Sequence, residues 1–294
     1  MLSYQHGYHA GGFADVHKHA ALCLLLAHLG RKPAPFCMID SHAGRGLYDL
    51  TGEQAGRTGE WQAGIARLIE SAPTDESLQP YLDVVAGFNK AGGDLVTYPG
   101  SPSIAARMMG AADRLLLIEA HPAEHAALRG VFRRDRRVHI HKRDSFEALP
   151  GLIPPAERRG LALIDPSYEI KAEYRSVPVM VGSALRRWPT GIFAIWYPLL
   201  PDDRHGPLVA GLDALARPVL IAELTGPAGS PAPGPANSPA NGPAIRQGLR
   251  GTGLAVINPP WRFDESLAAA GAAIARCLFG ANGNHTVRVT GDRP

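Results

Sequence analysis

Short apolar runs recur along the chain, and stretches with helical spacing separate them. The runs, each of which predicts a strand, lie at residues 36–39, 115–118, 138–140, 161–164, 192–196, 219–222, 254–257 and 287–289. Most of them lack the polar alternation of a half-exposed strand, which favours strands buried on both faces of a sheet. Residues 172–188 and 264–278 have the periodicity of helices. The pattern predicts an α/β fold with a doubly wound, mostly parallel sheet and helices on both faces.

Two stretches interrupt this rhythm. More than seventy residues separate the first two predicted strands, whereas a simple crossover needs far fewer. Helical spacing at 61–71 and 81–91 predicts that residues 50–110 form a small helical insertion at the top of the sheet. Residues 226–244 contain no large apolar residue, which predicts a flexible loop. We therefore expect residues 1–294 to form one domain that carries an insertion and a loop.

The composition is that of a soluble globular protein. Of the 294 residues, 45% are hydrophobic and 19% are charged, and the formal net charge is +3 with neutral histidines. This mild basicity permits an anionic partner without requiring one. Three distant cysteines, Cys23, Cys37 and Cys277, make neither a disulfide framework nor a CxxC metal motif, which fits a reducing cytoplasmic setting. The apolar stretch 20–29 is too short to span a membrane and lacks a cleavage site after it, so we expect a buried helix there.

The first predicted strand runs directly into a glycine-containing turn, DSHAGRG at residues 40–46. Gly44 and Gly46 allow the backbone to turn sharply and approach a ligand, although an ordinary tight turn has the same spelling. The second strand ends at Glu119, where a carboxylate accepts hydrogen bonds from ribose hydroxyls. The third strand leads to Asp144, which is placed to receive an adenine amino group. Solvated strand ends would explain either acid alone, and together the two acids favour an adenosine-containing cofactor.

The glycine spacing separates two classes of cofactor. A dinucleotide requires GxGxxG at the start of a helix, with the pyrophosphate on the helix N-terminus. Here Gly46 is followed by Leu47, Tyr48 and Asp49, so the third glycine is missing. S-adenosylmethionine carries no phosphate and tolerates the looser AGxG turn, which makes it the expected cofactor.

The fourth predicted strand ends in the polar and aromatic sequence DPSY. The exocyclic amine of adenine is a poor nucleophile because its lone pair is delocalised into the ring. Two acceptors aimed at its N–H bonds favour the pyramidal amine, and the Asp165 carboxylate and the Pro166 carbonyl supply them. Tyr168 offers a flat face on which the target base stacks in a reactive pose. The carboxylate also takes the proton that the amine releases.

A second sequence, NPPW at residues 258–261, matches the aminomethyltransferase pattern [DN]PP[YFW] more closely than DPSY does. Position favours DPSY, because it follows the fourth strand next to the glycine turn, where the strand order of a doubly wound sheet reverses. NPPW ends a late strand that we expect farther out in the sheet. We interpret NPPW as a tight strand exit with a core tryptophan, Trp261.

The N-terminal segment is rich in histidine and also carries Tyr4, Asp15 and Lys18. His6, His9, His17 and His19 are not spaced as helical i, i+4 pairs, and no cysteine lies near them, so we expect no metal site. A cap over the active site that contacts RNA phosphate or the cofactor carboxylate fits better. Arginine pairs elsewhere are able to follow a phosphate backbone, although each alone is more typical of a solvated surface. These pairs lie within residues 133–137, 158–159 and 186–187.

Several longer motifs occur in a fixed order along the chain: MLSYQHGYHAGGFADVHKHA, DSHAGRGLY, RTGEW, YPGSP, LIEAHP, RRGLALIDPSYE, WYPL and INPPW. From Met1 to about Val289 the chain thereby resembles the bacterial 23S ribosomal RNA (adenine-N6)-methyltransferase J family. The resemblance implies a Rossmann-like class I methyltransferase with a helical insertion after the first strand. It also implies S-adenosylmethionine as the methyl donor and one adenine of 23S rRNA as the acceptor.

The resemblance also implies roles for individual residues. Asp165 is the catalytic acceptor, with Pro166 and Tyr168 beside it in the motif. Tyr4 meets the rRNA substrate, and His6 and Lys18 lie in the same N-terminal block. The implied cofactor contacts, to which the turn adds Gly44, are His19, His42, Ser101, Glu119, Asp144, Ser145 and Asp165.

One position departs from the DPPY spelling that is usual in the family. Ser167 stands in place of the second proline, which restores a backbone N–H and loosens the local chain. The Pro166 carbonyl is still presented, so we expect the activity to be retained. Ser145 is a smaller departure, because a glycine often follows the acid at that place.

Other functions remain open from the residues alone. The same motif serves DNA adenine and protein-glutamine methyltransferases, and the fold also suits a nicotinamide-dependent oxidoreductase. A non-catalytic RNA-binding module is a further reading, although it leaves the strand-end acids unexplained. The leading expectation is a cytoplasmic, monomeric enzyme that uses S-adenosylmethionine and acts on free rRNA or an assembling large subunit, without metal or membrane.

Overall fold

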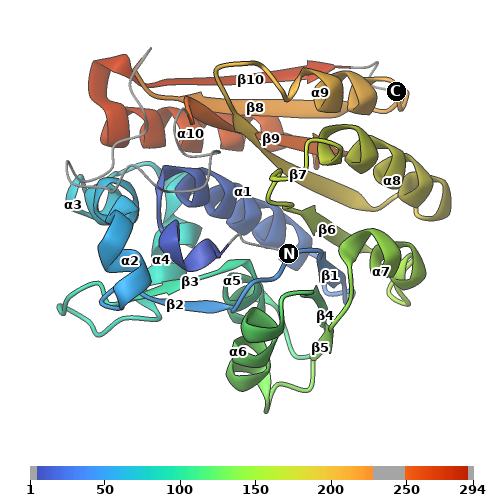
Figure 1. The fold of residues 1–294 in the computed structure, drawn as a ribbon, viewed down its shortest axis with the longest axis horizontal. Helices are drawn as coiled ribbons and strands as arrows, with labels where there is room; N and C mark the ends of the chain where they lie inside the picture. Colours follow the sequence, from blue (N-terminus) through green and yellow to red (C-terminus); the bar gives the residue numbers. More distant parts are fainter. Residues whose placement is uncertain (1–4, 228–248, 291–294) are drawn as a thin grey trace.

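A computed structural model describes residues 5–227 and 249–290 of the chain (Figure 1). Tyr4 and residues 228–244 of the predicted loop lie outside the described residues. Five strands of the described part run parallel to one another in the main sheet. They are β1 (Cys37–Asp40), β4 (Arg114–Ile118), β5 (Val138–His141), β6 (Gly160–Ile164) and β7 (Ile192–Leu199). Each covers an apolar run of the sequence, so the prediction of a mostly parallel α/β sheet is confirmed.

Three further strands extend the main sheet: β8 (Val219–Thr225), β9 (Gly251–Ile257) and β10 (Asn284–Thr290). Two of them, β9 and β10, run against the parallel strands, whereas β8 runs with them. The strand order is β10-β8-β9-β7-β6-β1-β4-β5, and β9 pairs antiparallel with both β7 and β8. Because β9 runs against the parallel strands, its last residue lies level with the start of β7: Ile257 pairs with Phe193. We call the edge where β1, β4, β5, β6 and β7 finish the carboxyl edge, and the opposite one the far edge.

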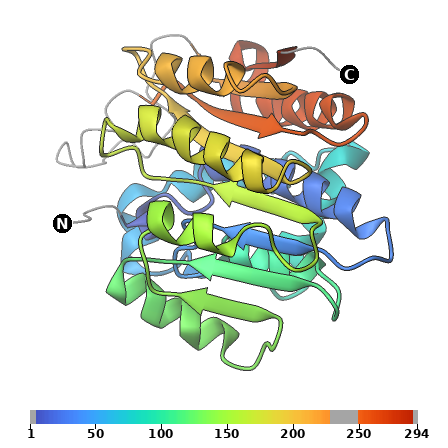
Figure 2. The ribbon, with the colours of Figure 1, turned by 90° about the vertical axis from the view of Figure 1, so that its right-hand side faces the viewer.

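Helices cover both faces of the sheet, as the unbroken apolar strands predict. One face packs against α1 (Phe13–Gly30), α5 (Ser101–Met108), α6 (Pro122–Phe132) and α10 (Phe263–Phe279). The other face packs against α7 (Ser145–Leu152), α8 (Glu173–Arg187) and α9 (Gly206–Asp213), which lie in front of the sheet in Figure 2. Neighbouring strand residues alternate between the two cores, since Met38 faces the α1 side and Ile39 the α8 side.

The chain between β1 and β4 contains helices near the predicted ranges 61–71 and 81–91, further helical segments that were not predicted, and a small unpredicted sheet. The helical segments are α2 (Glu53–Thr58), a π-helical turn Gln62–Ala66 that continues into α3 (Arg67–Glu70), a short 3₁₀ turn Glu76–Leu78 and α4 (Gln79–Ala86). Two three-residue strands, β2 (Leu47–Asp49) and β3 (Thr97–Pro99), pair antiparallel. Strands this short carry no period-2 pattern long enough to read.

Helix α1 crosses the molecule between this inserted segment and the main sheet (Figure 1). Leu22, Leu25 and Leu26 are each at most 2% exposed, which confirms the buried helix expected at residues 20–29. Within residues 5–227 and 249–290, no helix combines the length and the apolar character needed to cross a bilayer. The position of α1 matters for function, because its first turns bring Asp15, Lys18 and His19 into the interior next to the carboxyl edge.

Candidate active site

The candidate site forms where parallel strands end side by side. Asp40 ends β1, Glu119 follows β4, Asp144 follows β5 and Asp165 follows β6. In the sheet β1 lies between β4 and β6, so residues that are far apart in the chain meet at one edge. Carboxyl ends of parallel strands at such a switch point are the usual place for a ligand in open α/β sheets.

The glycine turn after β1 is held by the predicted ribose acid. The backbone N–H of Gly44 donates to Glu119 Oε2 over 2.8 Å, and the N–H of His121 donates to Glu119 Oε1 over 2.7 Å. Burial raises the pKa of Glu119, and these two N–H donors oppose the rise. Gly44 has a φ of 61°, and a Cβ there would lie 2.4 Å from the Tyr48 hydroxyl. A side chain at position 44 would therefore be strained in conformation and would require the Tyr48 hydroxyl to move.

His42 and Ser145 meet across the site. The Ser145 hydroxyl lies 2.9 Å from His42 Nε2, and the Ser41 hydroxyl lies 2.7 Å from His42 Nδ1. Burial lowers the pKa of His42 to about 4, so the ring is neutral at physiological pH. Asp144 begins α7, with Oδ1 accepting from the N–H groups of Phe146 and Glu147. The loops after β1 and β5 are thus joined where the sequence predicts an adenosine group.

Asp40 is a buried acid for which the sequence predicted no role beyond its place in the glycine turn. It is 0% exposed, its Oδ1 accepts from the His42 N–H over 3.2 Å, and its Oδ2 has no hydrogen-bond partner. Burial raises its pKa to about 6, and the neighbouring Ser101 hydroxyl opposes part of that rise. Ser101 itself starts α5 and is 6% exposed, so this predicted contact lies beside the turn. A buried carboxylate oxygen without a donor is costly unless a ligand supplies one.

Asp165 is tied to helix α1 through Lys18. Lys18 Nζ donates to Asp165 Oδ2 over 2.6 Å and lies 3.0 Å from Asp15 Oδ1. Asp15 Oδ2 in turn accepts from His6 Nε2 over 2.9 Å and from the Gly11 N–H over 3.0 Å. The side chains of Lys18 and Asp165 are 5% and 13% exposed. No sequence signal marks the contact, because 147 residues separate its two partners.

Burial and charge act in opposite directions on these groups. Burial raises the pKa of Asp165, and the charge and hydrogen bond of Lys18 oppose the rise. For Lys18, burial disfavours the charged form, but the two carboxylates outweigh it and raise its pKa. The pKa of Asp15 is lowered well below its usual value, because His6 and Lys18 overcome its burial. Lys18 therefore remains a fixed cation that holds one oxygen of Asp165.

The aromatic residue of DPSY does not present a free face. Tyr168 is 2% exposed, its ring stacks on Tyr174 at 4.5 Å, and its hydroxyl donates to the Trp196 carbonyl over 2.8 Å. Its backbone has a positive φ of 53°. Stacking on a target base, the role predicted for Tyr168, therefore requires the ring to leave this packing. Trp196 in β7 is only half buried, and its ring centroid lies 5.7 Å from Nζ of Lys18, the partner of Asp165.

NPPW lies at the far edge, because β9 is antiparallel to β7. Asn258 Nδ2 donates to the carbonyls of Pro189 and Gly191 over 2.9 and 2.8 Å. The expectation of a core tryptophan is wrong, since Trp261 is 80% exposed. The tight strand exit is present, with positive φ angles of 54° at Asn258 and 57° at Arg262. We expected NPPW to lie farther out in the sheet than DPSY. The reversed direction of β9 separates the two motifs more completely, because it places NPPW at the opposite edge.

The N-terminal histidines are dispersed among different partners. His9 Nδ1 lies 2.9 Å from Glu60 Oε1, His17 Nε2 lies 3.2 Å from His285 Nε2, and His19 Nδ1 lies 2.7 Å from the Tyr98 hydroxyl. Burial lowers the pKa of His19 to about 3, so this predicted cofactor contact is a neutral interior residue. Across the described ranges, no three His, Cys, Asp or Glu side chains are grouped as metal ligands.

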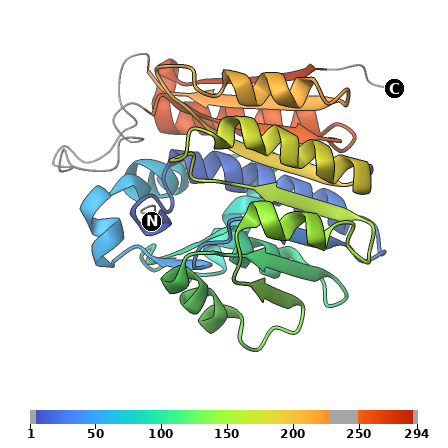
Figure 3. The ribbon, with the colours of Figure 1, turned by 45° about the vertical axis from the view of Figure 1, so that its right-hand side comes forward.

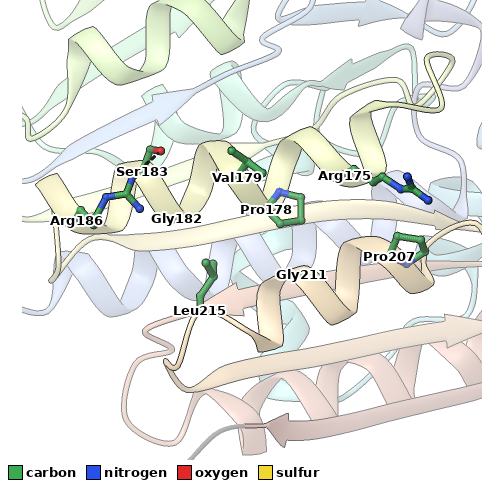
Figure 4. Close-up of a pocket in the computed structure, with 9 residues that line it drawn as sticks. All are labelled: Arg175, Pro178, Val179, Gly182, Ser183, Arg186, Pro207, Gly211 and Leu215. Atoms are coloured by element: carbon green, nitrogen blue, oxygen red, sulfur yellow. Dashed lines mark hydrogen bonds between the residues drawn. The ribbon is translucent and has the colours of Figure 1, made fainter.

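A shallow cavity of about 330 Å³ lies elsewhere, between α8 and α9 (Figure 4). Its floor is apolar and includes Pro178, Val179 and Leu215, and Arg175 and Arg186 stand at its ends. None of the strand-end acids lines it. The cavity is therefore not the predicted cofactor site.

Comparison with known proteins identifies a family for this chain. Residues 33–290 match the model of a family described as "Ribosomal RNA large subunit methyltransferase D, RlmJ". Ribosomal RNA large subunit methyltransferase J of Escherichia coli strain K12 is 39% identical over 268 residues, which cover 91% of this chain and 90% of that protein. The protein of the same name from Haemophilus influenzae is 36% identical over 268 residues, with the same shares.

A solved structure agrees in fold over nearly the whole length. A crystal structure of a Legionella pneumophila protein superposes with a TM-score of 0.83 at 30% identity. The superposition covers 96% of this chain and 98% of that one. The inserted segment and the reversed strands thus belong to an architecture that at least one experimentally solved chain shares.

Proposed function

Because the chain belongs to the ribosomal RNA large subunit methyltransferase J family, we propose that it transfers a methyl group from S-adenosylmethionine to N6 of one adenine in 23S rRNA. The observation that supports this most is the position of Asp165, which projects from β6 beside the glycine turn of β1. The proposed setting is the bacterial cytoplasm, where the rRNA is, and the proposed enzyme is a monomer.

The residues at the carboxyl edge fit the proposed cofactor. Gly44 gives a close approach for a ligand, and the Glu119 carboxylate has lone pairs left for ribose hydroxyls after accepting two N–H bonds. The unpartnered Oδ2 of Asp40 suits a cationic donor such as the ammonium of the methionine part. S-adenosylmethionine supplies an electrophilic methyl group on a sulfonium. We propose that it is bound by the predicted contacts His42, Ser101, Asp144 and Ser145, with His19 forming a wall behind them.

The proposed acceptor chemistry uses both oxygens of Asp165. Lys18 holds Oδ2, which leaves Oδ1 and the Pro166 carbonyl to accept the two N–H bonds of an adenine amine. The transfer would form one N–C bond, break the S–C bond of the methyl group and leave S-adenosylhomocysteine. The amine would release one proton, which the Asp165 carboxylate takes. Burial raises the pKa of Asp165, which makes it a better base, and the charge of Lys18 favours its ionised form.

The N-terminal segment positions this acceptor. Asp15 joins His6 and Gly11 to Lys18, and through Lys18 to Asp165, so the start of the chain and the catalytic carboxylate form one network. We propose that Tyr4, His6 and Lys18 contact the rRNA substrate or hold it next to Asp165. We also propose that Trp196 provides the flat face for the target base, a role that we first assigned to Tyr168.

Methylation of defined substrates tests the proposal. The purified protein is incubated with labelled S-adenosylmethionine and 23S rRNA, DNA or ribosomal protein, and N6-methyladenine in 23S rRNA is mapped by mass spectrometry. We expect label in one adenine of the rRNA. Label in DNA or in a protein glutamine would support the related aminomethyltransferases instead. Stabilisation by NAD(H) but not by S-adenosylhomocysteine in a thermal-shift assay would support the oxidoreductase.

A further inference from the structure

The most cationic part of the chain lies at one end of the main sheet. Residues 129–143 carry seven arginines and lysines but a single carboxylate, Asp135. That carboxylate is already paired, because Arg137 Nη2 donates to Asp135 Oδ2 over 2.6 Å. Six cations remain, and we call them the β5 stripe: Arg129, Arg133, Arg134, Arg136, Lys142 and Arg143.

The β5 stripe follows an edge strand. Within the described sheet, β5 pairs only with β4, so its other side is open (Figure 3, where α6 and β5 lie at the lower end, away from β10). Arg133, Arg134 and Arg136 stand in the turn between α6 and β5, near the far edge, and Lys142 and Arg143 follow β5 at the carboxyl edge. At about 3.3 Å per residue, the stripe extends over roughly 20 Å.

The cations of the β5 stripe are exposed, and no carboxylate of the described residues pairs with them. All six side chains are exposed, and within residues 5–227 and 249–290 none of them forms an ion pair. The nearby Glu124 is committed to Arg45, which donates to it twice, over 2.6 and 2.9 Å. The pKa of His125 is lowered by burial and by Lys142 and Arg129, which shows that these cations act on the same surface. Cations kept close together without carboxylates are typical of a surface that binds a polyanion.

We propose that the β5 stripe binds the phosphodiester backbone of the substrate RNA, away from the adenine that is methylated. This proposal rests on the proposed function, because it extends the site at Asp165 to a second contact with the same rRNA. Strands β6 and β5 are three positions apart in the sheet, a distance of about 14 Å. About four or five stacked nucleotides cover the distance to Lys142 and Arg143 at ~3.4 Å each. The arginines before β5 lie roughly 20 Å farther along the strand, so an RNA element of about seven or more nucleotides reaches both Asp165 and the whole stripe.

The α8–α9 cavity is the alternative surface, and its chemistry fits RNA less well. It has Arg175 and Arg186 at its ends, but its floor is apolar (Figure 4). Carboxylates also stand at the end nearest the carboxyl edge, where Asp202 pairs with Arg204 and Glu173 begins α8. Arg175 and Arg186 are exposed and form no ion pair within the described ranges, so their replacement offers a control that removes two surface charges from another face.

The test compares two sets of charge-removing substitutions in the full chain. The first combines Arg133→Gln, Arg134→Gln and Arg136→Gln, and the control combines Arg175→Gln and Arg186→Gln. The Kd for a 23S rRNA fragment is measured without cofactor at several salt concentrations, and kcat and KM are measured with cofactor. Melting temperature and S-adenosylhomocysteine binding show whether each variant is folded.

We expect the triple variant to bind the rRNA fragment about tenfold or more weakly, with kcat at saturating RNA within about twofold of wild type. The slope of log Kd against log salt decreases by about two to three, since each phosphate contact contributes ~0.7–0.9. The control variant keeps the wild-type affinity and slope.

Two results overturn the proposal: a folded triple variant with wild-type Kd and salt slope, or an equal loss in the control variant. Failure of the proposed function would give a different experimental result, because the wild-type protein would then leave 23S rRNA unmethylated. The RNA-binding comparison is readable in either case, since it does not depend on turnover.

Discussion

DPSY at the end of β6 and NPPW at the end of β9 are nearly the same sequence in two different places. Each follows a buried apolar strand and combines a polar residue, proline and an aromatic ring. They differ in strand direction, because β6 runs with the parallel strands and β9 runs against them. DPSY is therefore delivered to the carboxyl edge and NPPW to the far edge, so the direction of the strand decides which copy meets the cofactor site.

The surroundings of the two motifs differ accordingly. Asp165 is a buried carboxylate whose partner, Lys18, comes from helix α1, and a second buried acid, Asp40, ends the strand next to it. Asn258 is satisfied by two backbone carbonyls, and Trp261 stands 80% exposed. The carboxyl edge holds groups whose charges are kept out of water, whereas the far-edge motif closes a turn. Six substitutions, in five experiments, test this contrast.

The largest effect is expected from removing the polar residue of each motif in turn. Asp165→Ala loses the proton acceptor, so we expect kcat to fall by about a thousandfold while S-adenosylhomocysteine still binds. Asn258→Ala loses two hydrogen bonds and about 1–3 kcal/mol of stability but keeps its kcat. Methylation rates and chemical denaturation measure both. A kcat loss in Asn258→Ala as large as that in Asp165→Ala would remove the distinction between the motifs.

The next effect is expected at Lys18, which only the first motif has as a partner. Lys18→Met leaves Asp15 and Asp165 buried without their shared cation, so we expect a loss of about 3 kcal/mol of stability. Because Lys18 lowers the pKa of Asp165, its removal raises that pKa. The acidic limb of the kcat/KM profile then moves to higher pH. An unshifted limb in a folded Lys18→Met protein would show that Lys18 does not act on the catalytic group.

Asp40 provides a pH test of the carboxyl edge. Its folded-state pKa of about 6 lies above the ordinary 3.8, so the folded protein binds the proton more tightly than the unfolded chain. In the cofactor-free protein this lowers stability by about 3 kcal/mol as pH rises from about 4 to about 6, with no further loss above that range. Asp40→Asn should lack this contribution, which is measured as the wild-type minus variant difference in unfolding free energy against pH. An unchanged pH dependence would contradict the burial argument.

A smaller effect is expected from restoring the usual family sequence in the first motif. Ser167→Pro restores DPPY, and we expect kcat to stay within about threefold, because the Asp165 and Pro166 acceptors are unchanged. Stability rises by about 0.4–1 kcal/mol if the backbone at 167 suits proline, through a stiffer unfolded chain. Parallel measurement of kcat and the unfolding midpoint checks both. A large gain in kcat would mean that the second proline of the motif matters more for catalysis than the position of the motif at the carboxyl edge.

The smallest effect is expected from the aromatic residue of the second motif. Trp261→Ala removes an exposed side chain, so stability should change by no more than about 0.5 kcal/mol and methylation should not change. A melting curve and a rate measurement suffice. A marked loss of rRNA methylation would show that this part of the far edge takes part in substrate binding. That result would contradict the assignment of substrate binding to the first motif rather than the second.

Much of the fold was predictable because burial on both faces leaves a simple signal. The apolar runs marked all eight strands of the main sheet, and the glycine turn with Glu119 marked its carboxyl edge. The direction of β9 was not predictable, since an apolar run reads the same whichever way the strand points. The short strands β2 and β3 offered too few residues for a pattern.

Part of the candidate site was predictable from the sequence, and part was not. Asp165, His42, Asp144 and Ser145 follow strands or a known motif, so the chain order alone places them at one edge. The contact of Lys18 with Asp165 joins residues 147 positions apart, and only packing creates it. The burial of Tyr168 was missed for a related reason, because its contacts with Tyr174 and the Trp196 carbonyl are also created by packing.

The most direct test is the structure of the protein in complex with S-adenosylhomocysteine. The account predicts that the ligand lies at the carboxyl edge, with its ribose hydroxyls on Glu119 and its sulfur facing Asp165. A ligand at the far edge beside Asn258, or a sulfur atom turned away from Asp165, would contradict it.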